Sequence, residues 1–309
     1  MAKDDKTEKD TKENTLDLKS FTYASPEHKP YQRWIIRGIE RLTGKIRLWR
    51  LYNEFQHDNS RSEETFWDAA IRKLEVTVNY DRAKLAEIPK TGPLVVVANH
   101  PYGVLDGVIL NMLMGKVRDD YKVLTNSVLC KAEEAKGNLL EIDFNQTEEA
   151  LKTNLATRKK AREVLKEGGC IAVFAAGGVS SIPTWKDKVA QDTEWQPFIA
   201  GLIQGSKATV VPLFFEGQNS RMFQFASLIS PTLRLALCFK EMADKIGWTI
   251  RVRVGAPIPY SDLDGIGDRA ALCHELRRRT YELGGMETLP PPKPAYRTDL
   301  PSKDKPKAY

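Results

Sequence analysis

The feature of this sequence that most constrains its fold is an apolar run, Leu94–Ala98, that ends abruptly at Asn99 and His100. The run is rich in β-branched valines, which is typical of a strand buried on both faces of a covered sheet. Pro101 and Gly103 break the strand directly afterwards. A core strand therefore meets a loop at His100, and ligands bind at this edge in covered α/β sheets.

Two side chains of this loop form a candidate catalytic pair. An imidazole such as that of His100 can take up a proton near neutral pH. A carboxylate on its far nitrogen, such as that of Asp106, would fix the tautomer and stabilise the imidazolium that forms. The pair includes no protein nucleophile, so the attacking hydroxyl would come from a substrate. The alternative is a loop-capping aspartate beside a hydrogen-bonded histidine, and the strand-end setting favours the catalytic pair.

Two later strands are also predicted to end in polar or glycine-rich loops. Residues 171–174 form a buried strand before Gly177 and Gly178, where backbone N–H groups can approach an anionic or carbonyl oxygen closely. A strand with Val210, Val211 and Pro212 ends in a polar loop over residues 216–220. These ends supply the other candidate site residues.

The motifs together resemble the lysophospholipid, or glycerolipid, acyltransferase superfamily. They are Asn-His-Pro with Asp106, the Gly-rich end at residues 177–178, and Val-Pro-x-x-Phe-x-Gly-x-Asn-Ser over residues 211–220. Five residues separate His100 from Asp106, whereas the usual form of the superfamily has four. The five-residue form resembles the branch that holds hemolysin-like proteins and lyso-ornithine-lipid acyltransferases.

The resemblance implies acyl transfer from an acyl thioester to a lyso-lipid hydroxyl, with His100 as the base and Asp106 as its partner. The donor would be an acyl carrier protein or coenzyme A thioester, and no bound cofactor is expected. Backbone N–H groups near Gly177 and Gly178 are candidates for stabilising the oxyanion. The candidate substrate-binding residues are Asn99, Gly103, Gly177, Gly178, Ser180, Glu216 and Asn219.

Two departures from the superfamily concern the acceptor. Residues 142–145 hold no arginine where the second block commonly has one, and Ala176 replaces the glutamate of the third block. Lysophosphatidic acid would need a guanidinium clamp, so a lyso-aminolipid resembling a lyso-ornithine lipid is favoured, with Asp143 or Glu216 meeting its cationic group. The alternatives are a lysophosphatidic acid acyltransferase, a thioesterase or hydrolase, and a non-enzymatic membrane-binding protein.

Residues 31–52 predict one continuous amphipathic helix. Its apolar positions recur at spacings of four and three: Ile35, Ile39, Leu42, Ile46 and Trp49. A basic helix with Trp near both ends suits the plane of an anionic membrane surface, whereas Gly38 and Gly44 would also fit a helix packed closely on its own domain. The candidate membrane contacts are Trp34, Arg37, Arg41, Trp49 and Arg50.

Alternating strands and helices from Val76 to Val254 predict a single α/β domain with a central, mostly parallel or mixed sheet covered by helices. The amphipathic N-terminal helix precedes it. The predicted divisions are a disordered tail (1–28), membrane-surface helices (29–75), the acyltransferase domain (76–283) and a flexible tail rich in Pro and Lys (284–309). Within them we expect helices over 63–74 and 268–283, strands over 76–80, 121–124, 139–143 and 249–254, and a long charged helix capped by Asn145.

Charge and composition restrict the partners. Lys and Arg number 47 against 41 Asp and Glu, a formal net charge of +6, which suits an anionic surface. The sequence lacks an apolar stretch of about 18 residues, so no spanning helix is predicted. Histidines and cysteines show no metal-ligand spacing, and no nucleic-acid motif occurs, so neither a metal nor nucleic acid is expected. We therefore expect peripheral binding at the cytoplasmic face of the inner membrane. The basic residues 158–162 of the long helix are interpreted as a solvated face.

Overall fold

The computed structural model describes residues 18–19, 21–57, 64–126, 129–143, 147–286 and 292–294. The strands are β1 (Thr77–Tyr80), β2 (Leu94–Ala98), β3 (Tyr121–Asn126), β4 (Leu139–Ile142), β5 (Cys170–Phe174), β6 (Thr209–Phe215) and β7 (Thr249–Val254). The helices are α1 (Pro30–Thr43), α2 (Lys45–Gln56), α3 (Phe66–Lys73), α4 (Arg82–Ala86), α5 (Val104–Gly115), α6 (Glu148–Lys166), α7 (Pro197–Ser206), α8 (Arg221–Ile229), α9 (Pro231–Ala236), α10 (Cys238–Asp244) and α11 (Arg269–Glu282). Short 3₁₀ helices cover Leu129–Lys131, Glu133–Asn138 and Tyr260–Asp262.

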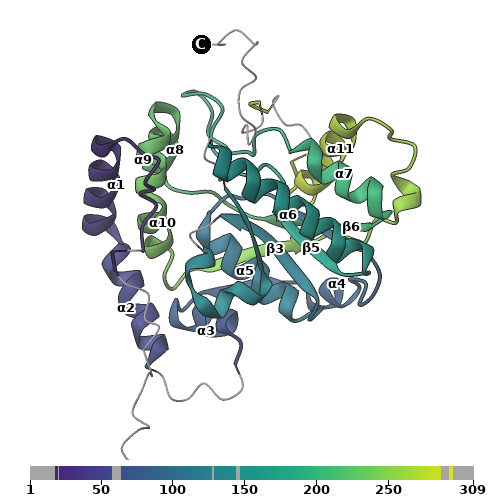
Figure 1. Cartoon of the computed structure of the whole chain (residues 1–309), viewed down its shortest axis with the longest axis horizontal. Helices are drawn as coiled ribbons and strands as arrows, with labels where there is room; N and C mark the ends of the chain where they lie inside the picture. The colour runs from purple at the N-terminus through teal and green to yellow at the C-terminus, as the bar shows by residue number, and fades with distance from the viewer. Residues whose placement is uncertain are drawn as a thin grey trace, which may run out of the picture.

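The strands of the described residues form one mixed sheet in the order β1-β7-β6-β2-β5-β3-β4. Figure 1 shows helices packed around this sheet. Neighbouring strands are parallel except β6 and β7, which are antiparallel. The predicted α/β class, with a mostly parallel sheet covered by helices, is therefore confirmed.

Strand β2 lies at the centre of the sheet and is buried on both faces. Leu94, Val96 and Ala98 join one core with α5, whereas Val95 and Val97 join a second core with α6, α7 and α11. Each fully buried Val or Leu contributes about 1.5–3 kcal/mol. This double burial explains why the strand reads as an uninterrupted apolar run.

The register brings the carboxyl ends of three strands to one edge of the sheet. Ala98 of β2 pairs with Phe174 of β5 and with Leu213 of β6. The loops that follow these strands therefore begin side by side. This edge holds the chemistry predicted from the sequence.

The prediction of one continuous helix over residues 31–52 is wrong, because α1 ends at Thr43 and α2 begins at Lys45. Gly44 lies against α10. A Cβ atom at Gly44 would lie only 2.7 Å from the carbonyl oxygen of Phe239. The close approach requires glycine and interrupts the helix, as the close-packing interpretation of this glycine expected.

The prediction of a disordered N-terminal tail is wrong for residues 21–28. The Phe21 ring lies 4.4 Å from that of Phe239, centroid to centroid. The Thr22 hydroxyl donates a hydrogen bond of 2.6 Å to buried Glu40, which also accepts the Tyr23 N–H. These hydrogen bonds from the N-terminal segment lower the free-energy cost of burying the Glu40 carboxylate. The rest of this predicted tail, apart from residues 18 and 19, lies outside the described residues.

Three other boundaries differ from the predictions. Helix α6 is capped by Thr147, whose hydroxyl accepts the Ala150 N–H, while the predicted cap Asn145 lies outside the described residues. Helix α3 packs Trp67 into the core with α5, and the predicted membrane-surface role of residues 29–75 stays a prediction. In the predicted C-terminal flexible tail, Lys293 accepts a backbone hydrogen bond of 2.8 Å from Glu194.

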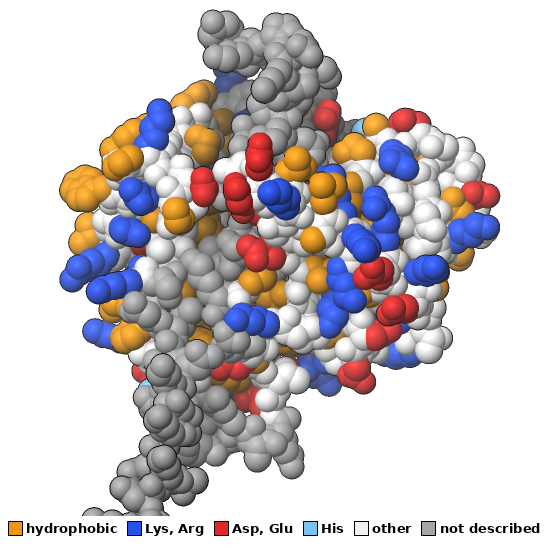
Figure 2. All heavy atoms as spheres, viewed as in Figure 1, with side chains coloured by type: hydrophobic (Ala, Val, Ile, Leu, Met, Phe, Trp, Pro, Cys, Tyr) orange, Lys and Arg blue, Asp and Glu red, His pale blue; other side chains and the backbone are white. Residues whose placement is uncertain are grey.

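Helix α1 has an inner and an outer side. Ile36 and Glu40 are buried against the domain, where α1 lies beside α9 and α10 (Figure 1). On the outer side, Trp34 is 79% and Leu42 is 87% exposed. Figure 2 shows hydrophobic and basic side chains together along this edge. No helix in the described ranges has the length and apolar character needed to span a membrane.

Candidate active site

The predicted catalytic pair lies together beyond the carboxyl end of β2. Nδ1 of His100 is 3.0 Å from Oδ2 of Asp106. The Asp106 side chain is fully buried, whereas that of His100 is 17% exposed. A carboxylate at Nδ1 places the ring proton there and leaves Nε2 to accept a proton from a substrate.

The start of α5 explains the spacing of five residues between the pair. Asp106 is the third residue of α5, and its Oδ2 accepts the N–H groups of Tyr102 at 2.7 Å and Gly103 at 3.0 Å. Gly103 has φ +75°, a conformation that favours glycine and turns the loop back on the helix. Burial raises the pKa of the Asp106 carboxyl, against the hydrogen bonds from His100, Tyr102 and Gly103, which lower it.

The end of β5 fixes the plane of the imidazole. The His100 and Phe174 rings stack with centroids 3.9 Å apart and an angle of 18° between their planes. Phe174 is the last residue of β5, directly beside the end of β2. The stack and the Asp106 hydrogen bond together hold the ring in one orientation.

Asp192, which the sequence analysis did not single out, ties the His100 loop to the segment after β5. Its buried Oδ1 accepts the His100 backbone N–H at 3.2 Å and the Ser180 hydroxyl at 2.5 Å. Its Oδ2 accepts the Trp195 indole N–H at 3.0 Å. Ser180 also donates its backbone N–H to the His100 carbonyl at 2.8 Å. No motif surrounds Asp192 in the sequence, so no local signal marks it.

Asn99 joins the ends of two neighbouring strands. Its side chain accepts the Phe215 N–H at 2.7 Å and donates to the Phe215 carbonyl at 3.0 Å. These two bonds use both ends of the amide and connect β2 to β6. Asn99 and Ser180, both predicted substrate contacts, therefore hold the framework of the site in this structure.

The loop after β6 is held by charged groups. Glu216 forms an ion pair with Arg253, and its other carboxylate oxygen lies 3.9 Å from Arg251. Asn219 accepts a hydrogen bond of 2.8 Å from Lys245, a buried residue that also pairs with Glu241. The two predicted substrate contacts in this loop thus have partners within the protein.

The glycines after β5 differ in their backbone bonding. The Gly177 N–H donates to the Phe174 carbonyl at 2.9 Å, so in this turn it already has a backbone acceptor. Gly178 and Val179 follow and are partly exposed. A Cβ atom placed on Gly103 would lie 3.2 Å from the Val179 side chain. The segment with Gly178 and Val179 therefore borders the catalytic loop.

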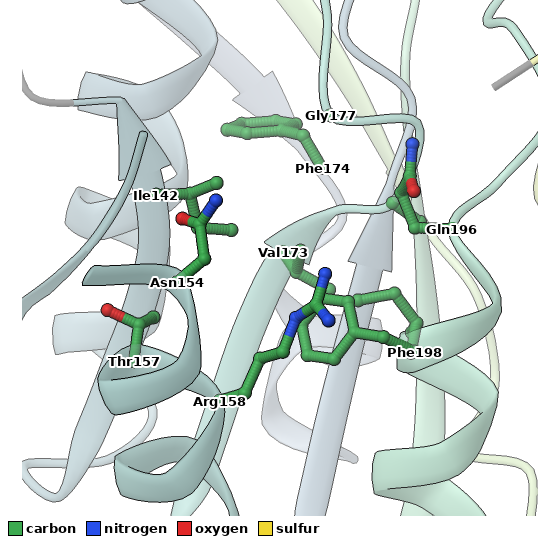
Figure 3. A pocket seen from close by; sticks show the side chains of 11 residues that line it. Ile142, Asn154, Thr157, Arg158, Val173, Phe174, Gly177, Gln196 and Phe198 are labelled. Atoms are coloured by element: carbon green, nitrogen blue, oxygen red, sulfur yellow. The ribbon is translucent and has the colours of Figure 1, made fainter. Parts of the chain in front are cut away.

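A pocket is lined in part by Phe174, the residue on which the His100 ring stacks (Figure 3). Its space, including the opening to solvent, is about 420 Å³. The Arg158 guanidinium carbon lies 5.2 Å from the centre of the Phe198 ring, at one wall of the pocket. The other lining residues come from β4, α6, β5 with the following turn, and α7: Ile142, Asn154, Thr157, Val173, Ala175, Gly177, Gln196 and Ile199.

Comparison with known proteins decides the family. A family model described as acyltransferase matches residues 32–287. The chain belongs to the acyltransferase family. The predicted family membership is confirmed, and the protein is an acyltransferase.

Two curated relatives of this acyltransferase are lyso-glycine lipid O-acyltransferases. The protein from Phocaeicola vulgatus is 26% identical over 274 residues, covering 85% of this chain and 92% of the relative. The protein from Bacteroides thetaiotaomicron is 26% identical over 270 residues, covering 85% and 94%. Among solved structures, the 1-acyl-sn-glycerophosphate acyltransferase of Thermotoga maritima superposes with a TM-score of 0.43 at 12% identity, covering 84% of this chain and 96% of that one.

Proposed function

We propose that this acyltransferase moves a fatty acyl group from an acyl thioester to the hydroxyl of a lyso-lipid that carries an amino-acid headgroup. The observation that carries the proposal is the partly exposed His100 imidazole, oriented by buried Asp106 at the edge where three strands end. The names of the two relatives support a lyso-lipid acceptor. An acyl carrier protein or coenzyme A would carry the thioester.

The reaction needs one base and one site for the oxyanion. Nε2 of His100 accepts the proton of the acceptor hydroxyl, whose oxygen attacks the thioester carbonyl carbon. The negative oxygen of the tetrahedral intermediate meets the backbone N–H groups of Gly178 and Val179. The intermediate collapses with cleavage of the C–S bond, the leaving thiolate takes the proton from the imidazolium, and an ester remains on the acceptor.

The charges at the end of β6 do not point to an acceptor with a side-chain cation. Asp143 or Glu216 was predicted to meet the ammonium group of an ornithine-like headgroup, and of these Glu216 is paired with Arg253. A headgroup such as glycine needs no such partner. Glycine has no hydroxyl, so in such an acceptor the acylated hydroxyl lies on the fatty chain.

The acceptor is tested by competition. Purified enzyme receives one acyl thioester and, in mixed micelles, equal amounts of a glycine-linked lyso-lipid, an ornithine-linked lyso-lipid and lysophosphatidic acid. We expect kcat/KM for the glycine-linked acceptor to exceed that for lysophosphatidic acid by about tenfold, equivalent to about 1.4 kcal/mol. A preference for lysophosphatidic acid would overturn the acceptor assignment. Release of free fatty acid without any acceptor would instead indicate a thioesterase or hydrolase.

We also propose that the outer side of α1 binds an anionic membrane surface. Trp34 and Leu42 supply exposed apolar area, and Arg37 and Arg41 are exposed on the same helix. Of the other predicted contacts, Trp49 is partly buried and Arg50 is exposed on α2. This arrangement is typical of a helix that lies in the membrane interface.

Reversing two of these charges tests the membrane proposal. The double variant Arg37→Glu and Arg41→Glu should float less with anionic liposomes, because each basic residue near such a surface contributes about 1 kcal/mol. Added salt should weaken binding of the wild type. The control variant Arg82→Glu with Lys159→Glu carries the same charge change on α4 and α6, both away from α1 (Figure 1). Equal flotation of the wild type and the α1 variant would show that the helix is only structural.

A further inference from the structure

We propose that a second apolar surface, on α8 and the segment after β5, also binds the anionic membrane. This surface, which we call the α8 surface, consists of Trp185, Val189, Met222, Phe225 and Ile229. The inference rests on the proposed function, in which the acceptor is a membrane lipid. It extends the membrane contact proposed for α1 to a part of the chain that no motif marks.

Helix α8 has apolar residues on two sides. Phe223 and Ala226 are buried in a cluster with residues of α9 and α10. Met222, Phe225 and Ile229 recur at spacings of three and four, so they share another side of the helix. Met222 is exposed, and Ile229 is 64% exposed. An apolar stripe that the fold leaves exposed in this way indicates contact with a partner.

The segment after β5 widens the stripe. The Trp185 ring stacks on the Phe225 ring with centroids 5.5 Å apart, yet Trp185 is 60% exposed. The segment is held beside α8 by the Ile182 N–H, which donates to the Gln224 side chain at 3.0 Å. Val189 of the same segment is also exposed. Exposed Trp is typical of the membrane interface, because its ring is apolar and its N–H is polar.

The charges around the α8 surface are positive. Arg221, Lys186 and Lys188 are exposed at its edges. The acidic residue of the segment 182–190 is Asp187, whose carboxylate accepts the N–H and the hydroxyl of Thr184. The sequences of α8 and α9 contain no Asp or Glu. Basic residues around an apolar surface are complementary to anionic lipid headgroups.

The α8 surface continues toward the outer side of α1. Helix α9 lies between α8 and α1 and contacts both (Figure 1). At the start of α1, the Gln32 side chain donates a hydrogen bond of 3.1 Å to Thr232, three residues after Ile229. Exposed Tyr31 and Trp34 of α1 therefore lie toward the end of α8. Figure 2 shows hydrophobic and basic side chains together over this end of the molecule.

A membrane fits this surface better than a second protein. The segment of the α8 surface follows Ser180, whose N–H donates to the His100 carbonyl at 2.8 Å. A membrane on the surface therefore lies next to the segment that borders the catalytic loop, where a lyso-lipid is needed. An acidic carrier protein would be bound through the basic residues. The exposed apolar side chains, which extend over both α8 and α1, instead match the apolar side of an interfacial helix.

Flotation with vesicles of phosphatidylcholine, with and without phosphatidylglycerol, tests the apolar part of the surface. We expect Ile229→Ser to lower the partition coefficient on the anionic vesicles about tenfold, as for the loss of one buried apolar side chain. Leu155→Ser is the matched control, because Leu155 is 55% exposed on α6 and away from the α8 surface. This control should float as the wild type does.

A second variant tests the charges of the surface. Lys186→Glu with Lys188→Glu should float less than the wild type with the anionic vesicles, because each basic residue near such a surface favours binding. The difference between this variant and the wild type should shrink as salt is added. The control variant on α4 and α6 that serves for α1 carries the same change of charge and should float as the wild type does.

The outcomes separate this inference from the other proposals. Wild-type flotation of both α8-surface variants would overturn it. Wild-type flotation with a raised KM for an acyl carrier protein thioester in Lys186→Glu with Lys188→Glu would assign the basic residues to an acidic carrier. Wild-type flotation with an altered oligomeric state of Ile229→Ser would assign the surface to a second copy of the chain, and both results overturn the membrane assignment. Flotation is measured without substrates, so failure of the proposed acyl transfer would leave its result unchanged.

Discussion

Replacing His100 by alanine is expected to lower the rate of acyl transfer by a factor of about 10² to 10⁴, the usual cost of losing a general base. The imidazole is the basic group that lies at the sheet edge with its Nδ1 bound to Asp106. The initial rate is measured with purified protein, an acyl thioester and a lyso-lipid. Asp106 keeps its hydrogen bonds from Tyr102 and Gly103 in this variant, so the loop should retain its fold.

A second histidine provides the control for this experiment. His274 is exposed on α11 and is not one of the candidate active-site residues. The variant His274→Ala should therefore transfer acyl groups at the rate of the wild type. Circular dichroism and the Tm of both variants report whether the fold is intact. Near-normal turnover by His100→Ala would refute general-base catalysis by this residue.

The parts of the fold that could be predicted are those with a local pattern. The run Leu94–Ala98 is apolar because both of its faces are buried, and the sequence alone shows this. The alternation in residues 249–254 likewise predicted β7, in which every second residue is buried. The His100–Asp106 pair was predictable because both residues belong to one short loop between a strand and a helix.

The parts that could not be predicted depend on contacts between distant segments. The break at Gly44 is caused by the backbone of Phe239, almost 200 positions away in the sequence, while the apolar spacing continues across it. Asp192 accepts a hydrogen bond from the His100 backbone, although the two residues lie 92 positions apart in the sequence. Nothing next to Asp192 in the chain indicates this proximity.

Motif residues at strand ends were harder to interpret than the catalytic pair. Asn99, Ser180 and Asn219 were predicted as substrate contacts from their position, yet each forms hydrogen bonds within the protein. A polar side chain at the edge of a sheet can hold a ligand or satisfy neighbouring backbone groups, and the sequence pattern is the same in both cases. Which role a side chain has depends on its hydrogen-bond partners. In this protein the partners are Phe215 of β6 for Asn99, Asp192 for Ser180 and Lys245 for Asn219.

Replacing Asp106 by asparagine is expected to lower kcat by a factor comparable to that for His100→Ala, about 10² to 10⁴. The amide oxygen can accept the N–H groups that Oδ2 accepts now, but a neutral side chain no longer stabilises the imidazolium. Oδ1 of Asp106 is buried with no hydrogen-bond partner within the described residues, so the amide NH₂ would occupy a place without an acceptor. Such an unsatisfied group costs about 1–3 kcal/mol and should lower the Tm.

The double variant shows whether the two residues act as one unit. If Asp106 works only through the imidazole, combining Asp106→Asn with His100→Ala should lower kcat no further than His100→Ala alone, because residues that act together are not additive. Asp187→Asn removes a carboxylate that accepts hydrogen bonds from exposed Thr184 and serves as the control for loss of one charge. If the fold-loss in kcat of the double variant equals the product of the two single fold-losses, Asp106 contributes to catalysis independently of His100.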